Sequence, residues 1–482
     1  MKPRILSSAR LSFPFAAAVA ALLAAPLASA ATIYWDGATP ASWNTNTNWS
    51  TASGADTPDP AAVPGALDDA IFNITTINGA ETVTLDANQA ARSLTFNNTD
   101  TTTLTGGGTA RTLTLGVGGM TMSASAGAVT LGDGTAGNNV LIGLTSGVRT
   151  WTNNSAANFT INNSATTFTR ATGASLVFNQ LGAGTFSTGT TLPTDATGIV
   201  GPWAFFGTGT SQRYAVNTAG TIAGYSAGTP AADANAFTSA TANYDFSTTA
   251  STTLSASRTA NAIRYAGTGG ITDLSTTAVT QNLTLNGILA TGASGTLTIQ
   301  RTLGSGTVVI GSSNELVIAG SQNVTINAPI SGTAKTLTYS GTGTLTLGGA
   351  INVGGSTWTG NLNVNSGTFT NNSSQANPNN LNVTTFVAAG AVYNFQGAFG
   401  AGVNFTNPLT VNGTFNKSGN GGSSFSAAAP ISGTGTINWS GQADLQLNGN
   451  NSGFTGTFNE NGSPANALTL GNNGALGAGI FV

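Results

Sequence analysis

One short pattern recurs along most of this chain: an apolar residue, a polar residue and a second apolar residue, bounded by Gly, Ser, Asn and Thr. Residues 341–367, GTGTLTLGGAINVGGSTWTGNLNVNSG, contain two copies, Leu345-Thr346-Leu347 and Leu362-Asn363-Val364. In a strand, such a triplet places its two apolar side chains on one face and its polar side chain on the other. The flanking glycines permit tight corners, including corners with positive φ. Short strands joined by corners predict a chain that winds into a β-solenoid.

Most of the triplets follow one another at intervals of about 8–12 residues, which is the spacing of an all-β fold with short turns. A sandwich or barrel has similar spacing, but its strands usually run to about 5–6 residues and end in recognisable hairpin turns. The runs in this chain are shorter, and Asn-Gly hairpin pairs are rare. We therefore predict an all-β chain with a parallel β-helix architecture.

The composition of the chain distinguishes this prediction from disorder. Only 6% of the 482 residues are charged and 65 are Gly, but 40% are hydrophobic and these fall in regular clusters. A disordered chain lacks such apolar content. Since the chain has no Cys, stacked hydrogen-bonded coils must stabilise it without disulfides. At roughly 20–25 residues per coil, we expect about 18–22 coils in a rod of about 90–105 Å.

The first 30 residues have the features of a signal peptide. A leader with three basic residues precedes an apolar core at residues 13–23, and Ala28-Ser29-Ala30 provides the small-x-small pattern of a cleavage site. A membrane-spanning helix is disfavoured because the apolar stretch is short, contains Pro14 and is followed by Pro26. We expect cleavage after Ala30 and a secreted or cell-surface location.

The mature chain divides into four further segments. We expect an N-terminal capping segment at 31–72, a first β-solenoid stretch at 73–190, an irregular insertion or discontinuity at 191–270, and a second β-solenoid stretch at 271–482. The insertion is aromatic and lacks the triplet rhythm, and residues 227–243, rich in Ala, Thr and Asn, contain no strand signal.

Three tryptophans, Trp35, Trp43 and Trp49, occur within fifteen residues of the capping segment. They suggest two alternatives: a surface on which a carbohydrate stacks, or a cap that covers the first open coil. We favour the cap because large aromatic side chains usually supply buried area and solenoid ends need covering.

Internal repeats support a solenoid and point to a family. Residues 328–332, APISG, recur at 429–433, and the aromatic-Thr-Gly element at Trp358 recurs at Phe454. The unit GTGTLTLGGAINVGGSTWTGNLNVNSGT and its echo GTINWSGQADLQLNGNNSGFTGTF resemble the autotransporter-associated β-strand repeat. This resemblance implies a right-handed parallel β-helix, similar to autotransporter passengers and pectin-lyase-like solenoids, and it brings no agreed catalytic residues.

The residue types available limit the possible chemistry. Without His or Cys, every Ser-His, Cys-His and imidazole-metal site is excluded. Carboxylates remain, and the candidates are Asp36, Asp68, Asp69, Asp86, Asp133, Asp273 and Glu315. The one adjacent pair, Asp68-Asp69, points to opposite faces of a strand, and no calcium-binding nonapeptide is present. We predict no catalytic, cofactor-binding or metal-binding residues.

These features predict an exported, non-enzymatic surface or secreted scaffold that is adhesin-like or envelope-associated. Its partners would be cell-surface glycans or envelope components. One alternative is a polysaccharide hydrolase or lyase on the same fold, which requires two or more carboxylates, or Lys or Arg beside aromatics, on one lateral face. Another is a carbohydrate-binding protein that uses Trp35, Trp43 and Trp49. Removal of the leader leaves 10 basic against 16 acidic residues, a balance that argues against binding to nucleic acid or anionic membranes. No second apolar segment is long enough to span a bilayer.

Overall fold

The computed structural model of the chain describes residues 30–73, 80–164, 168–188, 192, 194–349, 358–373, 383–396, 403–419, 423–425, 429–441, 445–460 and 468–482. About 50% of the chain is strand and about 3% is helix, and the strands stack as parallel coils in about 15 turns. The predicted all-β class and parallel β-solenoid are thereby confirmed. The expected signal peptide, residues 1–30, lies outside the described residues apart from Ala30.

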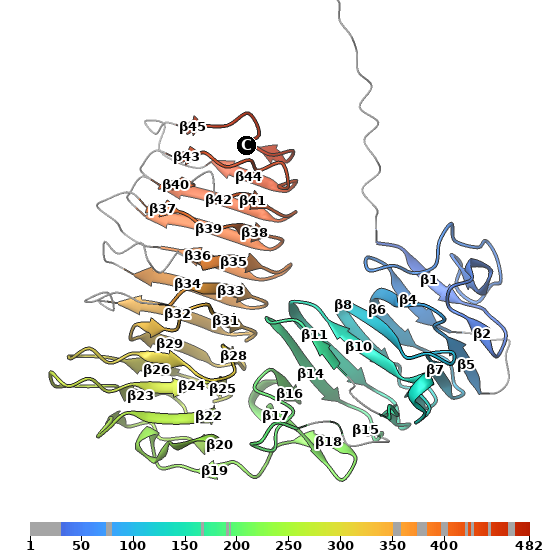
Figure 1. Cartoon of the computed structure of the whole chain (residues 1–482), viewed down its shortest axis with the longest axis horizontal. Helices are drawn as coiled ribbons and strands as arrows, with labels where there is room; N and C mark the ends of the chain where they lie inside the picture. The colour runs from blue at the N-terminus through green and yellow to red at the C-terminus, as the bar shows by residue number, and fades with distance from the viewer. Residues whose placement is uncertain are drawn as a thin grey trace, which may run out of the picture.

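The coils form two stacks, which we call the first arm (β1–β18) and the second arm (β19–β46) (Figure 1). The strands of the first arm are β1 (Thr32–Trp35), β2 (Ala41–Ser42), β3 (Trp49–Ser50), β4 (Asp69–Phe72), β5 (Glu81–Thr84), β6 (Gln89–Phe96), β7 (Thr102–Thr105), β8 (Arg111–Met122), β9 (Val129–Leu131), β10 (Val140–Leu144), β11 (Gly147–Asn153), β12 (Phe159–Ile161), β13 (Phe168–Arg170), β14 (Ala174–Gln180), β15 (Phe186–Thr188), β16 (Ala204–Phe206), β17 (Arg213–Thr218) and β18 (Thr221–Gly224).

The strands of the second arm are β19 (Thr229–Pro230), β20 (Thr238–Phe246), β21 (Ser251–Thr253), β22 (Arg258–Tyr265), β23 (Gly270–Asp273), β24 (Leu283–Leu285), β25 (Gly287–Ala290), β26 (Thr296–Gln300), β27 (Val308–Ile310), β28 (Glu315–Ala319), β29 (Asn323–Asn327), β30 (Ile330–Ser331), β31 (Lys335–Tyr339), β32 (Thr344–Gly349), β33 (Gly360–Val364), β34 (Thr368–Ser373), β35 (Val383–Val387), β36 (Val392–Phe395), β37 (Val403–Phe405), β38 (Leu409–Val411), β39 (Thr414–Gly419), β40 (Ser423–Phe425), β41 (Ile431–Ser432), β42 (Thr436–Gly441), β43 (Leu445–Leu447), β44 (Thr457–Glu460), β45 (Leu468–Leu470) and β46 (Ile480–Phe481). Short 3-10 helices lie at η1 (Asn46–Asn48), η2 (Ala136–Asn138), η3 (Gly209–Ser211) and η4 (Ala234–Ala236).

The triplet pattern determines which side chains enter the core of each arm. In β32, Leu345 is fully buried whereas Thr346 is partly exposed. Leu345 is in register with Val324 in the coil before it and with Phe369 in the coil after it. Apolar positions therefore stack into a continuous column, and the predicted assignment of the two strand faces is confirmed at this coil.

Polar side chains form a second kind of ladder on the outside of the second arm. The amide of Asn416 donates to Asn394, Asn438 donates to Asn416 and Asn459 donates to Asn438, each at 2.8 Å. These residues lie in β36, β39, β42 and β44, which are parallel neighbours in one 11-stranded sheet. Each coil is therefore joined to the next by side chains as well as by backbone.

The region expected to be irregular, 191–270, contains the seven strands β16–β22 and the first residue of β23. Strands β16, β17 and β18 pair antiparallel and complete the first arm. Strand β20 occupies Thr238–Phe246 and pairs parallel with β22, so the absence of a strand predicted for 227–243 is wrong. The sequence of this strand gives a weak signal, because Ala and Thr differ little in polarity and so do not produce a clear alternation of apolar and polar residues.

The chain does not form the single rod of about 18–22 coils that we expected, because about 15 turns are divided between two arms (Figure 1). The two arms lie side by side and meet along β14, β16 and β17 of the first arm and β22, β25 and β28 of the second, and they diverge beyond this contact (Figure 1). Strand β28 is buried along its whole length: Leu316 and Ile318 enter the core of the second arm, whereas Val317 and Ala319 pack toward the first arm. A strand covered on both faces is the feature that joins the arms.

Candidate functional site between the two arms

The three tryptophans proposed as a carbohydrate platform are buried instead. Trp35, Trp43 and Trp49 are 1%, 0% and 0% exposed. Trp49 packs against the other two with ring centroids 4.9 and 4.8 Å apart, and all three contact Phe72. This geometry corrects the stacking-surface alternative, because no ring face is open to a sugar, and it agrees with the favoured cap over the first coil.

The candidate carboxylates are mostly spread over separate coils, where they have local partners. Asp68 accepts from the backbone of Gly65, and Asp69 pairs with Arg92. Asp133 accepts hydrogen bonds from Thr135, which hold the pKa of that carboxyl below its usual range. Asp86 lies in a turn with a φ of 50°. Among the described residues, no group of three or more Asp or Glu is placed to hold a metal ion.

Asp36 and Asp273 also lie far from each other in the fold. Burial, with the charges of Asp56 and Asp59, raises the pKa of Asp36 to about 6. Asp273 is 2% exposed and accepts from Gln300 at 2.9 Å and from the backbone of Ser275 at 3.0 Å. Neither shares its surroundings with a second carboxylate of the candidate set, so neither forms a pair with another of the predicted candidates.

Glu315 differs from the other candidates because it joins the two arms. Its Oε2 receives Nη2 of Arg170 at 2.7 Å, and its Oε1 receives the backbone N–H of Gly173 at 3.0 Å and the hydroxyl of Thr338. The side chains of Arg170 and Glu315 are 17% and 6% exposed. A buried ion pair stabilises a structure only when further hydrogen bonds satisfy both groups, and Glu315 has them.

An apolar cluster and a polar cluster extend this contact along the interface. Val177 of β14 packs with Leu289 of β25 and Val317 of β28 in a cluster that is separate from the cores of the two arms. Further along, the hydroxyl of Tyr214 donates to the carbonyl of Ile263 at 3.2 Å. Burial raises the pKa of Tyr214 well above its usual value, so this hydroxyl stays protonated and remains a donor. The two arms therefore contact each other as a packed interface.

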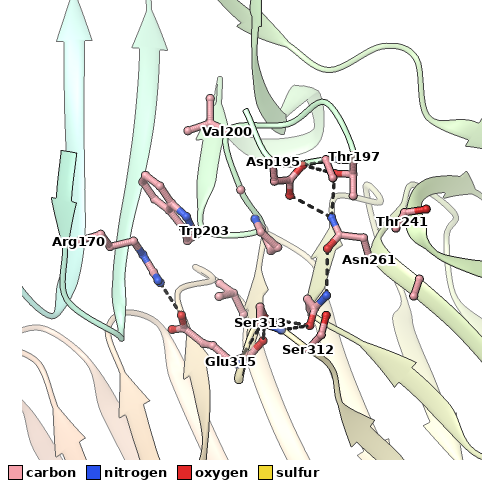
Figure 2. A pocket seen from close by; sticks show the side chains of 16 residues that line it. Arg170, Asp195, Thr197, Val200, Trp203, Thr241, Asn261, Ser312, Ser313 and Glu315 are labelled. Atoms are coloured by element: carbon pink, nitrogen blue, oxygen red, sulfur yellow. Dashed lines mark hydrogen bonds and ion pairs between the residues drawn. The ribbon is translucent and has the colours of Figure 1, made fainter. Parts of the chain in front are cut away.

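Beside this interface lies a pocket of about 380 Å³. Figure 2 shows its walls: Arg170 from β13 and Trp203 on one side, Asp195 and Thr197 of the loop that leads to β16 on another, and the second arm below. The pocket residues of the second arm are Ala240, Thr241, Asn261, Asn286, Ser312, Ser313, Glu315 and Val317. Both arms are needed to build it, and the first arm contributes β13 and the loop between β15 and β16.

The polar wall of the pocket is one connected hydrogen-bond network. The amide of Asn261 donates to Thr197 at 3.0 Å and lies 3.4 Å from Oδ2 of Asp195. Its oxygen receives the amide of Asn286 at 3.0 Å, and the oxygen of Asn286 receives the backbone N–H of Ser313 at 3.0 Å (Figure 2). Since Asn261 and Asn286 are 5% exposed, these contacts fix their orientations.

The opposite wall carries the aromatic side chain. The guanidinium of Arg170 lies 5.0 Å from the centre of the Trp203 ring, within the range of a cation–π contact. Phe168 meets the same ring edge-on at 6.0 Å. Arg170 is thus held by both Glu315 and Trp203, and it fixes the position of the ring beside the pocket.

Of the predicted carboxylates, only Glu315 is at this site. Arg170, Asp195, Trp203 and Asn261 were missed because they are distant in sequence and meet only when the arms fold together. A partial signal exists in the triplets: Leu176-Val177-Phe178 and Leu316-Val317-Ile318 have an apolar residue at the position that is otherwise polar. An apolar residue there indicates a strand with both faces covered.

Comparisons with protein-family models, with curated proteins and with solved structures give no match for this chain. In the part of the chain that the structure describes, no helix has both the length and the apolar character to cross a bilayer. The fold and the geometry of the inter-arm pocket therefore carry the functional argument.

Proposed function

We propose that this chain is an exported, non-enzymatic β-solenoid scaffold that acts at the cell surface or after secretion, in adhesion or as part of an envelope layer. The observation that carries this proposal is the architecture: stacked coils in two arms that are joined by a packed interface. Such a body holds its shape without a disulfide, and the chain has no Cys. The resemblance to the autotransporter-associated repeat supports the same role.

The chemistry of the interface supports a non-enzymatic role. A glycosidase needs one carboxyl that can donate a proton and a second that acts as nucleophile or base. Both oxygens of Glu315 are occupied by Arg170, Gly173 and Thr338. Oδ1 of Asp195 accepts the backbone N–H of Thr197 at 2.9 Å. Glu315, whose two oxygens already serve the fold, is poorly placed to transfer protons to a substrate, and Asp195 alone does not supply the pair of carboxyls that a glycosidase needs.

Export and processing test the proposal. The full chain, with a C-terminal epitope tag, is expressed in a bacterial host and followed by cell fractionation, and the product is sequenced from its N-terminus. We expect the tag outside the inner membrane on a chain that begins at Ala31. Ala30→Arg is the matched control, because it places a large charged residue where the cleavage site needs a small one. An uncleaved chain that stays in the cytoplasm would contradict the proposal.

Carbohydrate binding is a second candidate function, because one observation favours it. The inter-arm pocket brings Asp195 and Glu315 together with Arg170 and Trp203, which is the combination that the polysaccharide-active alternative requires. A release assay for reducing ends or unsaturated products, on a panel of plant and bacterial polysaccharides, separates binding from turnover. We expect no products, and product formation abolished by Asp195→Asn would favour an enzyme instead.

A further inference from the structure

We propose that the inter-arm pocket binds a neutral, hydroxyl-rich ligand about the size of one sugar ring. This inference rests on the carbohydrate-binding candidate function and does not depend on export or on the role of the scaffold. It follows from the charge balance of the pocket, its unused hydrogen-bonding groups and its size.

The charges in the pocket disfavour ionic ligands. Arg170 is the cation of the site, and its charge is neutralised by Glu315 at 2.7 Å. The carboxylate of Asp195 remains, so phosphate, sulfate or an acidic sugar meets a net negative wall. A divalent cation requires several oxygen ligands with carboxylates among them, and the described residues contain no group of three or more Asp or Glu that could hold a metal ion. A neutral ligand avoids both difficulties.

The hydrogen-bonding groups that remain suit hydroxyls. The indole N–H of Trp203 finds no acceptor among the residues that the structure describes, and its edge faces the pocket in Figure 2. Oδ2 of Asp195 has only a long contact, 3.4 Å from the amide of Asn261. The pocket therefore offers a donor on the aromatic wall and an acceptor on the opposite, polar wall. A hydroxyl both donates and accepts, so hydroxyls on different sides of one ring can satisfy both groups.

The remaining lining of the pocket suits the C–H face of such a ring. Val200, Pro202 and Trp203 present apolar surface between the polar groups. The volume of about 380 Å³ lies toward the small end of the ~300–1,000 Å³ range of small-molecule sites. The volume accommodates one ring, with little room for a second.

Binding of four neutral sugars to the full chain tests the proposal: glucose, galactose, mannose and N-acetylglucosamine, each titrated by saturation-transfer NMR. Choline and inorganic phosphate serve as charged probes. We expect saturable binding of at least one sugar and none of phosphate. The result that overturns the proposal is the absence of binding by all four sugars, whether or not choline or phosphate binds.

Variants locate the binding. Ser312 is exposed at the pocket, so Ser312→Trp fills the space without disturbing packed residues and should weaken binding by about tenfold or more. Ser125→Trp makes the same change at an exposed site of the first arm and should leave binding unchanged. Trp203→Phe keeps an aromatic ring but removes the donor, and a roughly three- to tenfold loss is expected for one hydrogen bond. Equal affinity of Ser312→Trp and the parent chain would refute the location.

Asp195→Asn distinguishes a sugar from an organic cation. The substitution removes the charge but keeps an oxygen acceptor, so sugar binding should fall by less than about tenfold. If choline binds and Asp195→Asn abolishes that binding while the sugars remain unbound, the pocket is a cation site and the proposal is wrong. Failure of sugar binding leaves the export and cleavage results unchanged, so the two proposals fail separately.

Discussion

Glu81 of β5 allows a sharp test of the first arm, because its carboxyl is buried near the N-terminal cap. The side chain is 1% exposed and receives the indole N–H of Trp35. Burial, opposed by hydrogen bonds from Trp35 and Asn98, raises the pKa of Glu81 from 4.5 to about 7. The folded arm therefore holds a proton on Glu81 that the unfolded chain releases at a lower pH.

The sign of the pH dependence follows from this pKa. Because the pKa is raised on folding, the contribution of Glu81 to stability is greatest below about pH 4.5 and is lost as pH rises to and beyond 7. A pKa difference of about 2.5 units corresponds to about 3 kcal/mol, or a few hundredfold (roughly 300) in the opening equilibrium. Since the chain has no His, no imidazole contributes to this window.

Hydrogen exchange measured by mass spectrometry, corrected for intrinsic rates, reports the opening of β1 and β4–β7. We expect parent protection in these strands to fall between pH 5 and pH 8, and Glu81→Gln to remove most of that fall, because Gln copies the neutral acid. In Glu81→Gln, a smaller decrease of protection with pH should remain because the pKa of Asp36 is also raised, to about 6. Adding Asp36→Asn should remove this remaining decrease. Asp133→Asn, in an exposed loop, is the control and should leave these strands unchanged. Parent protection that does not vary between pH 5 and pH 8, or an unchanged slope in Glu81→Gln, would refute the reasoning.

Three further substitutions test the coils, the interface and the ladder. Leu345→Asp buries a carboxylate in the core and should cost more than about 3 kcal/mol of local stability, so thermolysin should cut this variant near β32. Thr346→Asp should resist thermolysin as well as the parent chain does. Equal cleavage of the two variants would contradict the assignment of faces. Val317→Asp should separate the arms and raise the radius of gyration measured by small-angle X-ray scattering, while Val309→Asp, a partly exposed Val of the neighbouring β27, should not. Asn416→Ala removes two ladder hydrogen bonds of 2.8 Å and should lower the local free energy of unfolding by about 1–2 kcal/mol. Amide exchange in β36, β39 and β42 should then be faster. Unchanged exchange in these strands would show that the ladder adds no stability.

The sequence predicted the coils well because their signal is local. A triplet such as Leu345-Thr346-Leu347 predicts both that the segment is a strand and which face of that strand is buried. In the structure, Leu345 is buried and Thr346 is partly exposed. Strand β20 was missed because its Ala and Thr residues give little polarity contrast. The tryptophan cap was the favoured alternative because large aromatic side chains usually supply buried area, and three of them lie within fifteen residues.

The fold-back of the arms and the inter-arm pocket had no such local signal. Val177 and Val317 have an apolar residue at the outward position of a triplet, as an interface requires, but so does Val309, which lies outside the inter-arm cluster. An outward valine is therefore suggestive and not decisive. Arg170 and Glu315 are 145 residues apart, and nothing near either residue indicates the other. Whether two residues so far apart in sequence form an ion pair depends on how the whole chain between them folds.

The divergence of the two arms has a mechanical consequence. When a force draws the diverging ends of the arms apart, each arm acts as a lever on the interface. The contacts farthest from the junction are then loaded first, and the others follow one after another. The first to carry the load is the bond from Asn365 to the carbonyl of Gly173, at 2.6 Å. The ion pair of Arg170 follows, and Tyr214, nearest the point where the arms join, is loaded last. Opening by this sequence needs less peak force than sliding the same surfaces past each other.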